Sequence, residues 1–318
     1  MDSEQFQALP KSEIVSLMRQ NGDKVCVFPI NGTRRWFLLE HATPLGEDWL
    51  SRYMVVAAQN HIDLYTLCFE HGIDTLVTPI FGPDLADRGA KYMKLFAEGL
   101  ARMAEHEQFL DFYDQHRVRV RFYGDHRRFF AGTAYDYLPD LFDRAAERTR
   151  RHEAHRLFIG VCAHDAASSI AELSIRYHHQ TGRVPDRQAL ISLYYGEPVQ
   201  TASLFIGFEQ FVVFDTPLLA TGDTDLYFTV CPSPYLTASQ LRAILYDHLY
   251  SRQRREPEYG KMADEGWRYM KTFYQANQGN TLGIGKQRAS IWYPSGHVVE
   301  PLDALDKADA GYVDGSQG

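Results

Sequence analysis

The sequence predicts an α/β protein, a single domain with a central, mostly parallel six-stranded sheet flanked by helices. Short continuous apolar runs such as KVCVFPI and RLFIGVC are typical of strands that are covered on both faces. Segments with helical spacing of apolar residues separate these runs, and the alternation repeats along most of the chain. Strands that alternate with helices favour a parallel sheet with helices on both sides.

The elements follow one another in a regular order. Predicted strands cover residues 24–30, 75–80, 117–124, 156–162, 203–208 and 226–230. Predicted helices between them cover residues 48–70, 90–116, 135–155 and 164–181. Thr237 and Gln240 form a capping box, with Leu236 and Leu241 as its hydrophobic staple, and open a last helix that runs to about residue 252.

We expect one domain over residues 1–300 and a disordered tail over residues 301–318. No change in composition marks a domain boundary before about residue 252. The final residues, DALDKADAGYVDGSQG, are polar and rich in small and acidic residues. Such a composition cannot bury enough apolar surface to order a chain.

Composition narrows the class of protein. The chain has 318 residues, is 45% hydrophobic and carries a formal charge of -8. That charge argues against generic binding of nucleic acids, which needs a basic surface. No apolar run is long enough to span a bilayer, and the N-terminus lacks the features of a secretory signal, so we expect no stable membrane insertion and a cytoplasmic protein.

The four cysteines are far apart in the sequence and have no histidine at zinc spacing, so we expect reduced structural thiols.

The stretch INGTRRW follows the first predicted strand. Ligands of open parallel sheets bind beyond the carboxyl ends of the strands. Gly32 lets the backbone approach an anion closely, and Arg34 and Arg35 supply fixed positive charge, which together indicate a phosphate or diphosphate site. The alternative is that one arginine pairs with a carboxylate such as Glu40 while the other lies in solvent.

A second pattern precedes the strand over residues 226–230. Asp223 and Asp225 could reach a magnesium ion, although capping of the strand entry explains them equally well.

Several blocks of the sequence resemble those of tuberculosinol/isotuberculosinol synthases. The blocks are VFPINGTRRWF, FEHGIDTLVTPIFGPDLADRG, LFIGF, FDTPLLATGDTDLYFTVCPSPYLT and LRAILYDHLYSR. The resemblance covers roughly residues 10–255. The family includes kolavelool synthase and is similar to a branch of the cis-prenyltransferases.

The resemblance implies parallel strands ringed by helices, Mg²⁺ as cofactor, and a bicyclic C20 diterpenyl diphosphate made by a separate cyclase. The family ionises this allylic diphosphate and water captures the cation, whereas some members deliver the group to a nucleoside. Arg34 and Arg35, with Gly32 and Thr33 beside them, match the family's diphosphate-binding segment. Tyr53 and Tyr92 match tyrosines near the reacting allyl group, whose cation their aromatic faces stabilise.

The sequence departs from its relatives in two places. Chain-elongating relatives carry two arginines and a glycine pair that bind the diphosphate of the acceptor, where this chain reads FIGFEQF. This chain therefore has no evident binding site for a second diphosphate. Asn31 replaces an aspartate that the family ties to magnesium and activity, and an amide binds the ion more weakly than a carboxylate. Asp225 is the candidate to supply the missing charge, so Asn31 and Asp225 form the expected metal site.

The leading hypothesis is therefore a diterpene synthase that converts a kolavenyl or tuberculosinyl type diphosphate to an alcohol. The chain contains neither DDxxD nor DxDD, so the rings of the substrate must already be closed. Two alternatives stay open: diterpenyl transfer to a nucleoside or another nucleophile, and a non-catalytic partner subunit of a cis-prenyltransferase. We also expect a homodimer.

Overall fold

The structure is a computed structural model that describes most of the chain. It covers residues 1–22, 24–41, 49–81, 89–163, 166–213, 216–252, 258–288 and 291–294. Tertiary contacts group the chain into two units, Met1–Arg252 and Gln253–Gly318. One domain over residues 1–300 stays a prediction, and the tail predicted over 301–318 lies outside the described residues.

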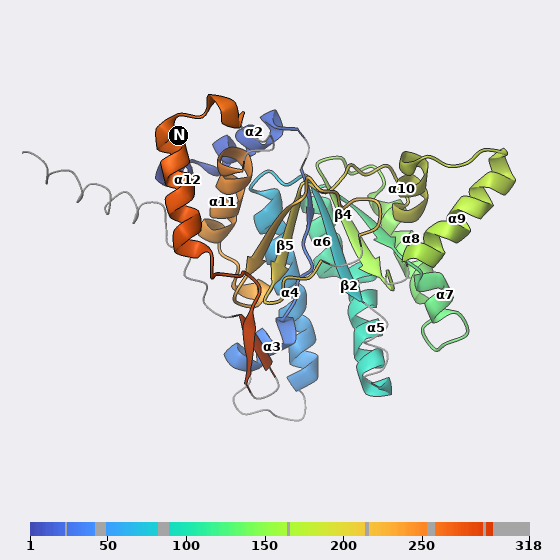
Figure 1. The fold of residues 1–318 in the computed structure, drawn as a ribbon. Coiled ribbons are helices and arrows are strands. Elements are labelled where there is room, and N and C mark those ends of the chain that lie inside the picture. Colours follow the sequence, from blue (N-terminus) through green and yellow to red (C-terminus); the bar gives the residue numbers. More distant parts are fainter. Residues whose placement is uncertain are drawn as a thin grey trace, which may run out of the picture. The chain divides into compact units, whose positions relative to one another are not determined.

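The first unit is built on a six-stranded sheet in which every pairing is parallel (Figure 1). Its order is β3-β4-β2-β1-β5-β6. The strands are β1 (Val25–Val27), β2 (Thr75–Phe81), β3 (Val118–Tyr123), β4 (His155–Val161), β5 (Leu204–Phe208) and β6 (Asp225–Thr229). All six predicted strands are confirmed.

Helices connect the strands and cover the sheet. They are α1 (Ser3–Ala8), α2 (Lys11–Gln20), α3 (Thr33–His41), α4 (Trp49–Phe69), α5 (Ala90–Glu105), α6 (Glu107–Gln115), α7 (His126–Phe130), α8 (Leu138–Thr149), α9 (Ala166–Thr181), α10 (Arg187–Tyr195) and α11 (Ala238–Tyr246). The predicted capping box is present, because Thr237 accepts from the Gln240 backbone while the Gln240 side chain bonds the Thr237 N–H. A π-helical turn over Asp247–Ser251 continues α11.

Alternate residues of the strands build two cores, one on each face of the sheet. Cys26, Leu76 and Leu157 pack into the larger core with side chains of α4, α5, α6, α8 and α11. Val25, Val27 and Phe158 face the other way and pack with residues of α10. Because successive side chains of a strand point to opposite faces, an unbroken apolar run fills both cores at once.

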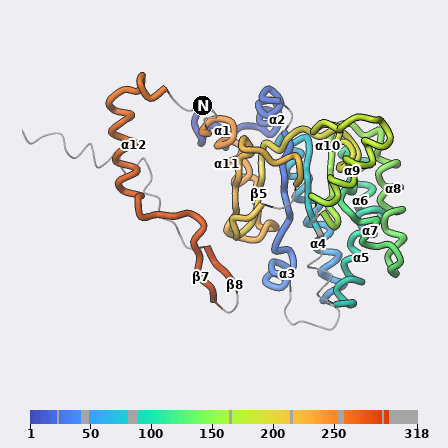
Figure 2. Tube along the Cα trace, turned by 45° about the vertical axis from the view of Figure 1, so that its right-hand side comes forward, coloured from blue at the N-terminus to red at the C-terminus, as the bar shows by residue number. Residues whose placement is uncertain are grey.

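A helix lies next to each end of β1. α2 precedes β1 and lies at one end of the sheet, whereas α3 follows β1 and lies at the other (Figures 1 and 2). Since all strands are parallel, α3 marks the edge at which every strand ends.

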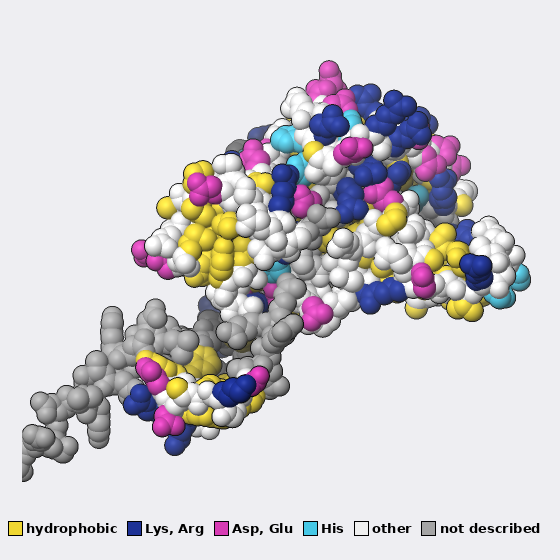
Figure 3. Space-filling view, turned by 90° about the horizontal axis from the view of Figure 1, so that it is seen from above, with side chains coloured by type: hydrophobic (Ala, Val, Ile, Leu, Met, Phe, Trp, Pro, Cys, Tyr) yellow, Lys and Arg dark blue, Asp and Glu magenta, His cyan; other side chains and the backbone are white. Residues whose placement is uncertain are grey.

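The end of the molecule where α2 leads into β1 is seen from above in Figure 3, where Lys and Arg side chains lie among Asp and Glu side chains. Ion pairs of the first unit include Arg148 with Asp114 at 2.6 Å. In the part of the chain that the structure covers, no helix is long and apolar enough to cross a bilayer.

The second unit contains α12 (Asp264–Asn277) and an antiparallel pair, β7 (Gly285–Arg288) and β8 (Ile291–Pro294). The sequence analysis predicted neither strand. All four cysteines are free, as expected, and Cys26, Cys68 and Cys162 are buried.

His155 gives the first unit an acid-sensitive contact. Its ring stacks on Phe69 with centroids 4.3 Å apart, and its Nδ1 atom has no hydrogen-bond partner among the described residues. Burial lowers the pKa of His155 from 6.5 to about 4. Protonation therefore favours the unfolded chain, and stability falls as the pH drops from about 6.5 toward 4.

We expect His155→Phe to keep the stack on Phe69 and to remove this proton binding. The loss of Tm between pH 7 and pH 5 should become smaller than in the unchanged protein, as measured by thermal unfolding at both pH values. His179→Phe on the exposed side of α9 is the control and should leave that loss unchanged. An equal loss for all three proteins would contradict the assignment.

Candidate functional site

One cavity of about 610 Å³ opens beyond the carboxyl end of β1. Its polar end is lined by Asn31, Gly32, Thr33, Arg34 and Arg35. Its apolar part runs between α4 and α5, and is lined by Met54, Ala58, Leu95, Leu100 and Met103, among others. Pockets of this size hold small organic ligands.

α3 starts at Thr33 and was not predicted. The two arginines therefore lie in the first turn of a helix, beside backbone N–H groups that have no partner within the helix. Both the N–H groups and the helix dipole favour an anion at this position. The helix contributes roughly 0.3–1 kcal/mol, and a hydrogen bond to a charged group about 1.5–3 kcal/mol, so the arginines dominate.

Gly32 allows the turn that joins β1 to α3. Its φ is +76°, and a Cβ atom added there would lie 2.9 Å from Cβ of Pro232 and 3.0 Å from a ring carbon of Phe208. The backbone N–H of Asn31 donates to Oγ of Ser233, and the N–H of Ser233 donates back to the carbonyl of Asn31. The end of β5 and the segments that follow β1 and β6 thus meet at one point.

The two arginines have different surroundings. Nη1 of Arg35 lies 3.0 Å from Oε2 of Glu209, and its guanidinium lies 5.5 Å from the ring centre of Phe208. Arg34 has no carboxylate partner among the described residues, and its guanidinium lies 5.8 Å from the ring centre of Tyr92. A carboxylate does pair with one arginine, as the alternative anticipated, but it is Glu209.

Glu40, the carboxylate named in that alternative, instead accepts a hydrogen bond from the hydroxyl of Tyr235.

Tyr53 and Tyr92 both line the cavity, from α4 and α5. The hydroxyl of Tyr53 lies 2.8 Å from Oγ1 of Thr33, and its ring meets the ring of Phe37 edge to face. Burial raises the pKa of Tyr53, and the hydrogen bond between Tyr53 and Thr33 only partly opposes that effect. Tyr53 therefore stays a neutral phenol at physiological pH.

His61 also lines the cavity, and the sequence analysis missed it. It follows Tyr53 by eight residues and Ala57 by four, a spacing that puts all three on one face of α4 and that could have revealed it. Its Nδ1 atom donates to the carbonyl of Ala57 at 2.7 Å. Burial lowers the pKa of His61, so the ring is neutral and its Nε2 atom is an acceptor.

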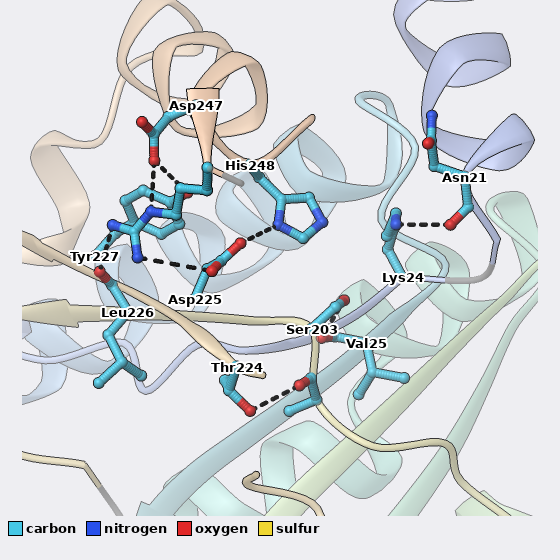
Figure 4. Close-up of polar contacts among 12 residues, drawn as sticks. Asn21, Lys24, Val25, Ser203, Thr224, Asp225, Leu226, Tyr227, Asp247 and His248 are labelled. Carbon is cyan, nitrogen blue, oxygen red and sulfur yellow. Dashed lines mark hydrogen bonds and ion pairs between the residues drawn. The ribbon is translucent and has the colours of Figure 1, made fainter. Parts of the chain in front are cut away.

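The structure does not bring Asp225 to this cavity. Asp225 is the first residue of β6, and its N–H donates to Ser203, whose own N–H donates to Val25 at the start of β1 (Figure 4). The cavity lies beyond the other end of these strands, roughly 13 Å away at 3.3 Å per residue. Asp225 therefore cannot supply the charge that Asn31 lacks, and that expectation is corrected.

Asp225 instead belongs to a polar network with the π-helical turn after α11 (Figure 4). Its carboxylate accepts from Nδ1 of His248 at 2.6 Å and lies 3.6 Å from Arg252. Arg252 and Tyr227 both donate to Asp247. These contacts tie the turn to the edge strand β6.

A magnesium ion finds few protein ligands at the cavity. No group of three or more His, Cys, Asp or Glu side chains within the described ranges could hold a metal. The carboxamide oxygen of Asn31 is the one sequence-predicted ligand that lines the cavity. One carboxamide oxygen is too few ligands for Mg²⁺, so a diphosphate and water molecules would have to supply the others. Proteins commonly hold Mg²⁺ in this way.

No protein-family model matches the chain. Tuberculosinyl adenosine transferase of Mycobacterium tuberculosis is 41% identical over 298 residues, which cover 93% of this chain and 99% of that protein. (+)-Kolavelool synthase of Herpetosiphon aurantiacus is 25% identical over 295 residues, which cover 90% of this chain and 94% of that protein.

Two solved structures share the fold. Lavandulyl diphosphate synthase from Lavandula x intermedia, in complex with dimethylallyl diphosphate, has a TM-score of 0.55 and 13% identity, over 75% of this chain and 98% of that chain. A probable undecaprenyl diphosphate synthase from Campylobacter jejuni has a TM-score of 0.55 and 17% identity, over 73% of this chain and 97% of that chain.

We expect Gly32→Ala to damage the polar end of the cavity. The added methyl group would meet Pro232 and Phe208, and the backbone would keep a conformation that costs a non-glycine residue about 1–2 kcal/mol. The Tm should fall, and binding of inorganic diphosphate, measured by calorimetry, should weaken at least about 10-fold because α3 shifts.

Gly222→Ala is the matched control, since nothing lies within 4 Å of a Cβ atom added there. It should change neither measurement. Unchanged diphosphate binding in Gly32→Ala would show that the turn does not position the anion site.

Proposed function

Because the chain belongs to the family of tuberculosinyl adenosine transferase, a diterpene-processing branch of the cis-prenyltransferase-like fold, we propose that it ionises a bicyclic C20 diterpenyl diphosphate and passes the diterpenyl cation to a nucleophile. The observation that carries the proposal is a cavity in which an arginine pair at a helix N-terminus adjoins a mostly apolar channel. This polarity matches a ligand with a diphosphate head and a hydrocarbon tail.

The polar end would stabilise the departure of diphosphate. The bond between the allylic carbon and the bridging oxygen breaks, and its electron pair leaves with the diphosphate. Arg34, Arg35 and the first N–H groups of α3 lie around the charge that develops, and they need no rearrangement to oppose it. Mg²⁺, held by the diphosphate with the carboxamide of Asn31, would neutralise part of the same charge.

The apolar channel would hold the hydrocarbon and protect the cation. Burial of hydrocarbon contributes about 0.8 kcal/mol per methylene, so the tail supplies most of the gross binding energy. The rings of Tyr53 and Tyr92 lie at the mouth of the channel, where the allylic carbon would sit. An aromatic face stabilises a cation by about 0.5–2 kcal/mol. Burial raises the pKa of Tyr53, so this phenol does not ionise and capture the cation prematurely.

The relatives support a proposal for the nucleophile. The 41% identity to tuberculosinyl adenosine transferase favours transfer to a nucleoside such as adenosine. The 25% identity to (+)-kolavelool synthase supports water, the nucleophile of our leading sequence hypothesis, less strongly. We therefore place nucleoside transfer first and release of a diterpene alcohol second. Capture by water releases one proton, which solvent accepts.

The substrate would come from a separate cyclase, because the chain contains neither the DDxxD motif of helical ionising synthases nor the DxDD motif of protonation-initiated cyclases. A cytoplasmic homodimer remains our prediction for the protein in the cell.

The decisive experiment incubates the purified full-length protein with Mg²⁺ and bicyclic diterpenyl diphosphates, with and without adenosine. Mass spectrometry of the products distinguishes a diterpenyl nucleoside from a diterpene alcohol. We expect the nucleoside adduct when adenosine is present. Alcohol alone in both reactions would favour water, and no product together with binding to a cis-prenyltransferase subunit would overturn the enzymatic proposal.

We predict that Arg34→Ala lowers kcat about 100- to 1000-fold, the usual cost of losing one preorganised charge stabiliser. Arg34 has no carboxylate partner among the described residues, so its charge is available to the diphosphate. Arg34→Lys should recover only part of the rate, since an ammonium lacks the two-pronged geometry of guanidinium. Turnover assays measure both variants, and an unchanged rate in Arg34→Ala would refute the role.

We predict that Gly99→Leu narrows the channel. A Cβ atom added at Gly99 would lie 2.6 Å from the terminal carbon of Met54, so a leucine would fill the space between α5 and α4. Binding of a C20 thiolodiphosphate analogue should weaken much more than binding of the C10 analogue, as measured by calorimetry. Glu98→Leu, at an exposed position of α5, is the control. Equal weakening of both analogues would contradict the placement of the tail.

A further inference from the structure

Glu209 is a buried acid that pairs with Arg35 at the polar end of the cavity, although Glu209 is not itself among the residues that line it. It directly follows β5, and its side chain is only 10% exposed. Its backbone has a φ of +62°, and its N–H donates to the carbonyl of Thr229 at 2.9 Å. A left-handed conformation is costly for glutamate, and such strained positions cluster at functional sites.

The electrostatics of α3 explain why an acid is useful there. The first turn of α3 carries two arginines and no acidic residue, and the helix dipole adds further positive charge at the same end. In the absence of a ligand, these like charges repel one another. The carboxylate of Glu209, 3.0 Å from Arg35, is the acidic partner that the described residues offer to this pair.

We propose that Glu209 is an internal counter-anion, which occupies Arg35 when the site is empty and competes with diphosphate for it. This inference rests on the proposed function and deepens it. The entering diphosphate takes Arg35 from Glu209, and the carboxylate returns to Arg35 when diphosphate leaves. Arg34, whose charge no described carboxylate shares, holds the anion throughout.

The competition matters most for the product. The substrate is held by its hydrocarbon tail as well as by its diphosphate, whereas inorganic diphosphate is held by its charge alone. A residue that weakens anion binding by a given free energy therefore removes a larger fraction of the product's binding free energy than of the substrate's. Because product release limits many enzymes, such a residue speeds turnover.

A purely structural ion pair would behave differently. Arg35 is 42% exposed, and an ion pair with one partner in solvent adds little to stability. If Glu209 served only to hold Arg35 in place, its removal would misplace the guanidinium and weaken diphosphate binding. If Glu209 competes, its removal strengthens diphosphate binding. The two roles thus predict opposite signs.

The test compares the full-length protein with Glu209→Gln by titration calorimetry with inorganic diphosphate. Glutamine keeps the size and a hydrogen-bond acceptor but loses the charge. We expect the Kd of inorganic diphosphate to fall about 10-fold, the factor that corresponds to one charge-assisted hydrogen bond. With a diterpenyl diphosphate, the variant should show stronger inhibition by added diphosphate and a lower kcat.

Glu197→Gln is the matched control. Glu197 is 11% exposed and pairs with Arg121 at 3.0 Å, but Arg121 does not line the cavity, whereas Arg35 does. Its replacement should leave the Kd of diphosphate unchanged. A second control repeats Glu209→Gln in an Arg35→Ala background, where the gain in affinity should disappear because the two residues act as a unit.

An unchanged or higher Kd in Glu209→Gln would overturn the proposal, as would a gain that persists without Arg35 or a wild-type protein that does not bind diphosphate. If Glu209→Gln does not fold, Glu209→Gly tolerates the left-handed backbone and carries the same test. The calorimetry uses no diterpenyl substrate. An absence of turnover would contradict the proposed function, whereas the calorimetry alone decides whether Glu209 competes with diphosphate.

Discussion

The close approach of Gly32 to the segment after β6 is the constraint on which the site depends. Without a side chain at residue 32, the chain can turn directly from β1 into α3 while it packs on Pro232 and Phe208. Reciprocal hydrogen bonds between Asn31 and Ser233 hold the same crossing. The ends of three neighbouring strands are thereby locked together, and the first turn of α3 acquires a fixed direction.

That fixed direction gives the cavity its electrical asymmetry. The arginine pair and the helix N-terminus bring positive charge to one end, while the walls between α4 and α5 are mostly apolar and also include Arg102 and His61. Low polarity in the channel strengthens every charge interaction at its mouth. Tyr53 and His61 are both neutral in this cavity, because burial raises the pKa of Tyr53 and lowers the pKa of His61. The cavity can therefore separate an anion from a hydrocarbon cation.

The sequence predicted the sheet well because its strands are unbroken apolar runs, and it predicted the start of α11 because Thr237 and Gln240 cap that helix locally. It missed α3, whose first turn carries two arginines that oppose the helix dipole. That turn is stabilised by contacts distant in sequence. The expected role of Asp225 was wrong because its place in the sequence does not reveal at which edge of the sheet it lies.

Glu209 and His61 were missed for a related reason. Each becomes a site residue only through a partner or a cavity that folding creates: Glu209 meets Arg35 across 174 residues of chain, and His61 faces the channel from within an ordinary helix. Arg34, Arg35, Tyr53 and Tyr92 were recognised from motifs, and the structure gathers them around one cavity.

The channel walls have a further consequence for how this family can diversify. Each turn of α4 or α5 contributes about two lining positions, so the cavity wall is graduated along each helix in steps of about 5.4 Å. The lining residues Tyr53, Ala57 and His61 mark successive steps along α4. One substitution at a given step would lengthen or shorten the accepted hydrocarbon while the diphosphate end stays intact. The substrate specificity of the family can therefore change without changes to the residues that bind the diphosphate.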